Sequence, residues 1–159
     1  MENYIKKANK TDIKLIQNMY NLYLYDKNQY TREYDNLCEN TFFDCDKKIV
    51  QTGRDREFYT IQANDKVIGF LIINKSKGRK KYQVEIVDLF IMNVMRKKDY
   101  GTIALNEIVS KYPGDYTVKI EGANSVALRF IENFIESKNM LAHISSCMDG
   151  RELYSFTAN

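Results

Sequence analysis

The chain has 159 residues, with 24 Lys and Arg against 21 Asp and Glu, so its formal net charge is only +3. This near balance argues against a dedicated nucleic-acid-binding protein, which usually carries a strong basic excess. One proline and seven glycines exclude a collagen-like chain and a disordered chain rich in these residues. The length predicts one domain, over residues 1–159.

The N-terminus shows no signal peptide, and no apolar run is long enough to span a membrane. We therefore expect a cytoplasmic protein without a membrane partner. Cys38, Cys45 and Cys147 form no CxxC pair, which favours free thiols over a zinc site. The sole histidine, His143, cannot build a multi-histidine metal site, so we expect no metal.

The first residues predict a short strand followed by a helix. Residues 4–8 alternate weakly, as a strand does. Thr11 and Asp12 offer an N-cap for the helix that follows. Its apolar residues recur at the spacing of one helical face, and they are Ile13, Ile16, Met19, Tyr20 and Tyr23. The polar, acidic segment over residues 26–46 is interpreted as helix plus loop.

A hairpin and a central strand come next. Strands are predicted over 58–63 and 66–73, and a basic turn over 74–81. The nearly continuous apolar run over 82–92 is typical of a central strand that is covered on both faces. Two helices are then predicted, over residues 102–112 and 125–135, with a strand over 116–120 between them. Two short strands follow, over residues 144–148 and 152–156. This alternation favours an α/β fold with helices packed on a mixed sheet.

The unit of strand, basic loop and helix over residues 82–112 is the strongest site candidate. The first backbone N–H groups of a helix lack partners within the helix and favour an anion. Arg96, Lys97 and Lys98 add positive charge beside that end, and Gly101 leaves room for close approach of a phosphate. A diphosphate is the natural ligand. The alternative is an ordinary solvated loop, because motifs this short match often by chance.

Residues 88–134 resemble the GNAT N-acetyltransferase superfamily. In that family a central strand leads into an Arg/Gln-x-x-Gly-x-Gly/Ala loop at a helix start, and residues 96–102 occupy this place. A later family helix opens with Asn-x-x-Ala-x-x-Phe/Leu, which Asn124, Ala127 and Phe130 match. The predicted order of elements also agrees with the family along the whole chain. The resemblance implies a central mixed, mostly antiparallel sheet of about six to seven strands, flanked by helices.

The resemblance further implies a binding site for acetyl-CoA or coenzyme A. The backbone of Ile91, Met92 and Asn93 would pair with the pantetheine arm, and Asn124 and Phe130 would flank it. The loop would hold the diphosphate through Arg96, Lys97, Lys98, Asp99, Tyr100, Gly101 and Thr102.

Two positions depart from the family pattern. Asp99 stands where the loop usually has its first glycine, and its carboxylate would repel a diphosphate unless it points to solvent. Ile131 stands where many members have a tyrosine that protonates the leaving thiolate. Tyr100, Tyr112 or water are the remaining candidates for that proton. These departures also fit an alternative, a GNAT-fold module that binds CoA without turnover.

Acetyl transfer to an amine needs a base that accepts the proton of the ammonium group. Asp88 and Glu85 interrupt the central strand and are the candidates, with Asp88 preferred because related proteins often carry an acid there. Strict alternation puts the two on opposite faces, whereas a β-bulge would change this. The alternative for either is a structural ion pair.

The acceptor predicted from charge is a cationic amine. Residues 26–46 contain six acids and two bases and border the acceptor cleft in the resembling fold, although a solvated helix face is the alternative. We expect transfer of an acetyl group to a primary amine of a small molecule or peptide, by direct attack in a ternary complex. A nucleic-acid role for the basic turn is disfavoured, and a homodimer is compatible with the sequence.

Overall fold

The computed structural model describes residues 4–31 and 55–159 of the chain. The strands in this part are β1 (Ile5–Lys7), β2 (Arg56–Ala63), β3 (Lys66–Lys77), β4 (Tyr82–Ile91), β5 (Gly114–Glu121), β6 (Ala142–Ser146) and β7 (Arg151–Ala158). The helices are α1 (Lys10–Thr31), α4 (Tyr100–Lys111) and α5 (Ser125–Ser137), with a short 3-10 turn η1 (Asn93–Met95). No helix among the described residues is long and apolar enough to cross a membrane.

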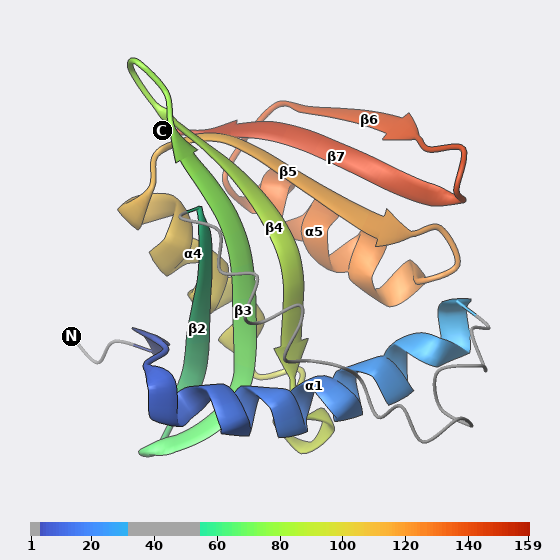
Figure 1. Cartoon of the computed structure of the whole chain (residues 1–159). Helices are drawn as coiled ribbons and strands as arrows, with labels where there is room; N and C mark the ends of the chain where they lie inside the picture. Colours follow the sequence, from blue (N-terminus) through green and yellow to red (C-terminus); the bar gives the residue numbers. More distant parts are fainter. Residues whose placement is uncertain (1–3, 32–54) are drawn as a thin grey trace.

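The strands form one seven-stranded sheet in the order β1-β2-β3-β4-β5-β7-β6. Neighbours pair antiparallel, except β4 and β5, which run parallel. Hairpin turns can join antiparallel neighbours, whereas the parallel pair needs the crossover through α4. In Figure 1, α1 crosses the front of the sheet, while α4 and α5 lie behind it. The predicted mixed, mostly antiparallel sheet with flanking helices is therefore confirmed.

The core lies on both faces of the sheet, and β4 contributes to each half. Val84 and Ile86 are buried on the face covered by α4 and α5. Phe90 is buried on the opposite face, together with Ile16 and Met19 of α1. This explains the nearly continuous apolar run of β4, and it confirms the prediction of a central strand covered on both faces.

A β-bulge interrupts β4. Ile86 lies opposite Ile73 of β3, but Asp88 lies opposite Ile72, so Val87 is the extra residue. The bulge overturns strict alternation, because it places Glu85 and Asp88 on the same face of the sheet, the face that α1 covers.

The N-cap of α1 is Asn9, not Thr11 or Asp12 as predicted. The Oδ1 atom of Asn9 accepts hydrogen bonds from the backbone N–H groups of Thr11 (2.8 Å) and Asp12 (3.1 Å). In return, the Asp12 carboxylate accepts from the N–H of Asn9 at 2.9 Å. This reciprocal arrangement is a capping box, in which Asp12 is the third helical residue rather than the cap.

The predicted basic turn over 74–81 is also too long, since β3 extends to Lys77. Two contacts explain the extension. The ammonium group of Lys75 lies 4.9 Å from the ring centre of Tyr112 and 5.8 Å from that of Tyr82. This lysine therefore packs on the two rings as part of β3 and does not belong to the turn. The N–H of Gly78 donates to the Lys81 carbonyl at 3.0 Å and closes a tight turn.

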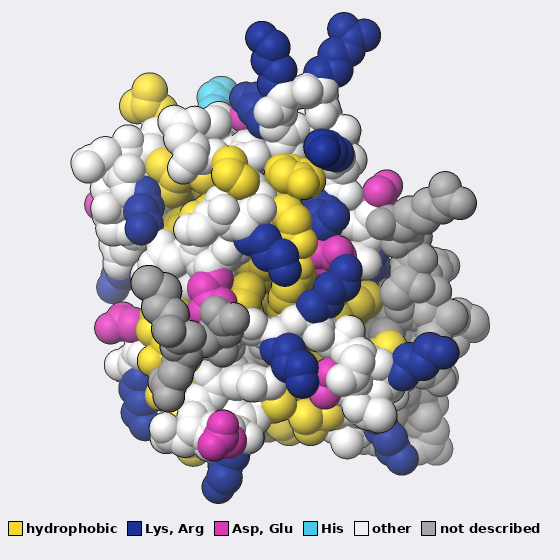
Figure 2. All heavy atoms as spheres, turned by 90° about the vertical axis from the view of Figure 1, so that its left-hand side faces the viewer, with side chains coloured by type: hydrophobic (Ala, Val, Ile, Leu, Met, Phe, Trp, Pro, Cys, Tyr) yellow, Lys and Arg dark blue, Asp and Glu magenta, His cyan; other side chains and the backbone are white. Residues whose placement is uncertain are grey.

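A buried carboxylate joins β2 to the C-terminal end of α4. Glu57, only 8% exposed, accepts hydrogen bonds from the hydroxyl groups of Tyr59 (2.6 Å) and Tyr112 (2.9 Å). The ammonium group of Lys7 lies 2.5 Å from it and that of Lys75 lies 3.7 Å from it. On the side of the molecule that carries β2 and α4, Figure 2 shows Lys and Arg side chains around hydrophobic ones, with acidic side chains between them.

Burial alone would raise the pKa of Glu57, but the hydrogen bonds from Lys7, Tyr59 and Tyr112 outweigh burial and hold that pKa at about 2. The Glu57→Gln variant is therefore expected to lose about 2–3 kcal/mol of unfolding free energy at neutral pH. Because the folded-state pKa lies below the ordinary value of 4.5, this stabilisation is complete above about pH 4.5 and is lost as the pH falls towards 2. Urea unfolding of both chains against pH measures it, and a difference that stays constant down to pH 2 would contradict the assignment.

Candidate functional site

The sheet opens between β4 and β5. The two strands pair from Tyr82 and Gly114 as far as Ile86 and Val118, although β4 continues to Ile91. The pairing ends where the bulge bends β4. A gap with an edge of β4 backbone is therefore built into the middle of the sheet.

Peptide groups of β4 face this gap. The N–H of Met92 donates to the Ile68 carbonyl of β3 at 2.8 Å. Because alternate residues of an antiparallel strand point to the same neighbour, the peptide groups of Leu89 and Ile91 point away from β3, towards the gap. Of the three residues predicted to pair with a pantetheine arm, Ile91 faces the gap, the Met92 N–H is used by β3, and Asn93 begins η1. The sequence did not predict that the peptide group of Leu89 faces the gap. Its orientation depends on the position of the bulge, which the register with β3 determines.

The loop before α4 uses left-handed backbone. Lys97 has a φ of 59° and Asp99 a φ of 60°, the region that favours glycine and that aspartate tolerates better than most residues. Asp99 is the N-cap of α4, and its carbonyl accepts from the N–H of Ile103 at 2.9 Å. Asp99, which stands where the family usually has its first loop glycine, thus adopts the left-handed conformation that glycine favours.

The first turn of α4 presents the anion-binding features expected of the loop. Backbone N–H groups of Tyr100, Gly101 and Thr102 lie at the start of the helix, where the helix itself provides no acceptors. Lys97 and Lys98 are exposed beside them. The arrangement favours a diphosphate or another anion at this end.

The missing side chain of Gly101 makes room for a neighbouring ring. A Cβ atom at this position would lie 3.1 Å from Cζ of Phe130 and 3.9 Å from Cδ2 of Leu89. The glycine therefore makes room for the Phe130 ring, which lets α5 pack closely against the start of α4. The missing side chain therefore serves helix packing.

Asn124 caps α5 as predicted, since its Oδ1 accepts from the N–H of Ala127 at 3.0 Å. This bond uses the oxygen of the side-chain amide and leaves its NH₂ group as a donor beside the start of the helix. Phe130 is partly buried against the core under α4 and α5. Phe130 thus lies beside the start of α4, because its ring faces Gly101.

Arg96 does not lie over the start of α4. Its guanidinium forms an ion pair with Asp26 on α1, and its Nε donates to the Ile91 carbonyl at 2.8 Å. In this structure the side chain therefore bonds to α1 and β4, while Lys97 and Lys98 lie exposed beside the start of α4.

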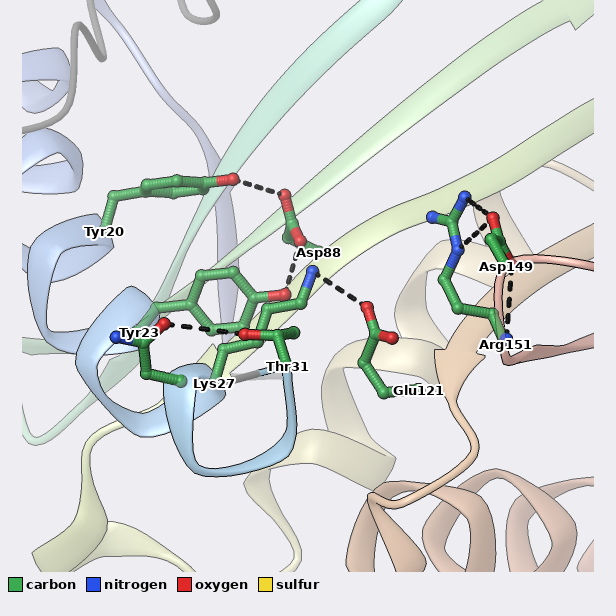
Figure 3. A network of polar contacts seen from close by, with 9 residues as sticks. Tyr20, Tyr23, Lys27, Thr31, Asp88, Glu121, Asp149 and Arg151 are labelled. Carbon is green, nitrogen blue, oxygen red and sulfur yellow. Dashed lines mark hydrogen bonds and ion pairs between the residues drawn. The ribbon is translucent and has the colours of Figure 1, made fainter. Parts of the chain in front are cut away.

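Asp88 is held by two tyrosines of α1 (Figure 3). The hydroxyl of Tyr23 donates to one carboxylate oxygen at 2.5 Å, and the hydroxyl of Tyr20 donates to the other at 3.0 Å. The two rings pack on Phe70 of β3. Burial and the neighbouring Asp88 carboxylate raise the pKa of Tyr23 far above its ordinary value, so Tyr23 keeps its proton and donates it in this bond.

Glu85 has a different setting on the same face. One of its oxygens accepts from Nδ2 of Asn74 at 2.7 Å, and Oδ1 of Asn74 accepts from Nε of Arg56 at 2.8 Å. Glu85 lies in the part of β4 that is still paired with β5, opposite Thr117, whereas Asp88 lies past the end of that pairing.

The structure narrows the candidates for protonating a thiolate. Ile131 is 3% exposed and belongs to the core. Tyr112 lies just past the C-terminal end of α4, about 18 Å from the helix start by the rise per residue, and is bound to Glu57. This position disfavours Tyr112 as the proton donor. Tyr100 is the first residue of α4, with its ring 6.3 Å from that of Tyr4.

Most of the predicted acidic segment, with Cys38 and Cys45, lies outside the described residues. The described part, up to Thr31, continues α1. Cys147 is a free, half-buried thiol, and His143 is exposed on the edge strand β6, away from β4 and β5.

The Tyr23→Phe variant removes only the hydroxyl group that bonds to Asp88. We expect it to lower the free energy of unfolding by about 1.5–3 kcal/mol, because a charged acceptor loses its donor. Tyr25→Phe is the matched control, since Tyr25 lies on the same helix with 72% of its surface exposed, and we expect a change within about 0.5 kcal/mol. Urea unfolding compares the two, and equal effects would mean that the Tyr23 bond does not hold α1 on the sheet.

Solved structures with the same fold include several acetyltransferases. PaiA N-acetyltransferase from Thermoplasma acidophilum, in complex with coenzyme A, is 17% identical, with 99% of each chain covered and a TM-score of 0.70. An acetyltransferase from Thermus thermophilus is 12% identical, with 96% of each chain covered and a TM-score of 0.65. An aminoglycoside acetyltransferase from an uncultured soil sample, in complex with sisomicin, is 15% identical over 82% of this chain and 85% of its own, with a TM-score of 0.58.

A search of curated protein sequences found no match. The model of the Acetyltransferase (GNAT) family, however, matches residues 16–134, from α1 through the gap and the loop before α4 to α5. Family members use acetyl-CoA as the acetyl donor and acetylate amines. This match covers well over half of the chain and includes the elements that form the site, so the chain belongs to the GNAT acetyltransferase family.

Proposed function

We propose that this chain transfers an acetyl group from acetyl-CoA to a primary amine of a small molecule or peptide, by direct attack of the amine on the thioester in a ternary complex. The observation that carries the proposal is the parting of β4 and β5 after Ile86, with β4 peptide groups along the gap and a helix start beyond it. An extended ligand with amide groups and a diphosphate matches these features in order.

The residues along the gap fit this cofactor. The peptide groups of Leu89 and Ile91 can pair with the amides of a pantetheine arm, as a further strand would. The first N–H groups of α4, with Lys97 and Lys98, suit the diphosphate. Bound there, acetyl-CoA supplies the activated acetyl thioester.

Asp88 is the group that accepts the proton of the attacking ammonium, directly or through water. It lies past the last β4–β5 pair, where the strands part, and Tyr20 and Tyr23 orient its carboxylate. Glu85 lies before the parting and is tied to Asn74. This difference in position favours Asp88 as the base and gives Glu85 a secondary role.

The proton for the leaving thiolate comes from Tyr100 or from water. With Ile131 in the core and Tyr112 bound at the far end of α4, Tyr100 is the remaining tyrosine among the candidates.

The acceptor is a cationic amine, because Glu85 and Asp88 both lie on the α1 face of β4 and their charge attracts an ammonium group. That a structurally similar enzyme is complexed with an aminoglycoside is consistent with this class.

The Asp88→Asn variant tests the base. We expect kcat to fall by about 100-fold or more, with little change in the affinity for CoA, since only proton transfer is impaired. Glu85→Gln is the matched control on the same strand and face, with an expected loss of less than about tenfold. Steady-state kinetics over a panel of amines, with calorimetry of CoA binding, measures both effects.

A larger loss in Glu85→Gln than in Asp88→Asn would reverse the two roles. Binding of CoA by the unmodified chain, without transfer to any amine, would instead favour a CoA-binding module that does not catalyse transfer.

The double variant Lys97→Ala with Lys98→Ala tests the diphosphate loop. We expect CoA to bind about tenfold more weakly and with a shallower dependence on salt, because two cations beside the helix start are removed. Arg79→Ala with Lys80→Ala in the β3–β4 turn removes the same charge from an exposed loop and is expected to leave the affinity unchanged. If both double variants bind CoA alike, the diphosphate does not lie at this loop.

A further inference from the structure

One arginine bonds to the edge of β4 that faces the gap. Arg96 follows η1, and its Nε donates to the Ile91 carbonyl at 2.8 Å. Its guanidinium lies 5.6 Å from the ring centre of Phe90, and its terminal nitrogen forms the ion pair with Asp26. The side chain is thus fixed in one place by three contacts, although 40% of it remains exposed.

The carbonyl that Arg96 uses belongs to the exposed edge of β4. Since the peptide groups of Leu89 and Ile91 point towards the gap, an extended ligand that pairs with this edge approaches the Ile91 oxygen. The Arg96 Nε atom, 2.8 Å from that oxygen, already donates a hydrogen bond to it. The ligand and Arg96 therefore compete for the same hydrogen-bond acceptor, the Ile91 carbonyl.

Adjacent residues of α1 connect this contact to both borders of the gap. Asp26 pairs with Arg96, which follows β4. Lys27 pairs with Glu121 at the end of β5, with 3.4 Å between nitrogen and oxygen (Figure 3). The last turns of α1 are therefore tied to the ends of the two strands that part.

We propose that Arg96 competes with the pantetheine arm of CoA for the Ile91 carbonyl, and that Asp26 sets the strength of this competition. The inference rests on the proposed cofactor site. Entry of the pantetheine arm moves the guanidinium away from Ile91 and Asp26. The arginine then adds its charge to the diphosphate loop, and the Asp26 carboxylate becomes available on the side of α1.

The consequence is a coupling between the two substrates. While Arg96 neutralises Asp26, the α1 side of the gap carries one negative charge fewer for a cationic amine. When CoA displaces Arg96, that charge is restored, and α1 remains tied through Lys27 and Glu121. The amine therefore binds more tightly after CoA than before it.

The Asp26→Asn variant tests the competition. It keeps the shape of the side chain and removes the ion pair, so Arg96 is held less strongly at Ile91. We expect CoA to bind about two- to fivefold more tightly, the range of a partly exposed ion pair. Asp26→Glu keeps the carboxylate and is expected to bind CoA as the unmodified chain does. Asp149→Asn removes a similar aspartate–arginine pair in the β6–β7 turn and is the matched control.

A second ligand separates competition from a general effect of charge. Calorimetry with the phosphoadenosine diphosphate half of CoA, which lacks the pantetheine arm, should show a smaller gain in Asp26→Asn than CoA does. Equal gains for both ligands would overturn the proposal, because then only the lost negative charge matters. Unchanged or weaker binding of CoA by Asp26→Asn would overturn it as well, while leaving the proposed function intact. Failure of the unmodified chain to bind CoA would overturn the proposed function and this inference with it.

Discussion

A single extra residue in β4 determines where the sheet opens. Up to Ile86 the strand pairs in parallel with β5, and at Val87 the register against β3 shifts by one. A bulge bends a strand and increases its twist, so β4 continues along β3 while its pairing with β5 ends. Without this parting, the peptide groups of Leu89 and Ile91 would be used by β5, and the sheet would have no internal edge to offer a ligand.

The same bulge places the charged groups of the site on two different faces of the sheet. The start of α4, whose first N–H groups have no acceptor within the helix, belongs with the exposed Lys97 and Lys98 to the side of α4 and α5. Asp88 comes to the opposite face, under the tyrosines of α1. The small net charge of +3 is therefore an average over regions of opposite charge, with cations in the loop before α4 and acids on the α1 face of β4. Such a separation suits an anionic donor and a cationic acceptor that approach a common gap from two sides.

Local pattern predicted the elements well, because helical spacing, alternation and capping residues act over a few positions. Asn124 and the central strand are examples. The features that depend on distant partners could not be read in this way. The position of the bulge follows from the register with β3, and Arg96 pairs with a residue 70 positions away. Gly101 is typical of a phosphate loop, yet the ring that requires it lies on another helix.

A crystal structure with CoA bound would show whether the parted strands hold the acetyl donor. We expect density for an extended pantetheine arm along Leu89 and Ile91, a diphosphate at the N–H groups of Tyr100 to Thr102, and a sulfur on the side of Asp88. CoA bound elsewhere on the molecule, with the edge of β4 untouched, would mean that the gap is not the donor site.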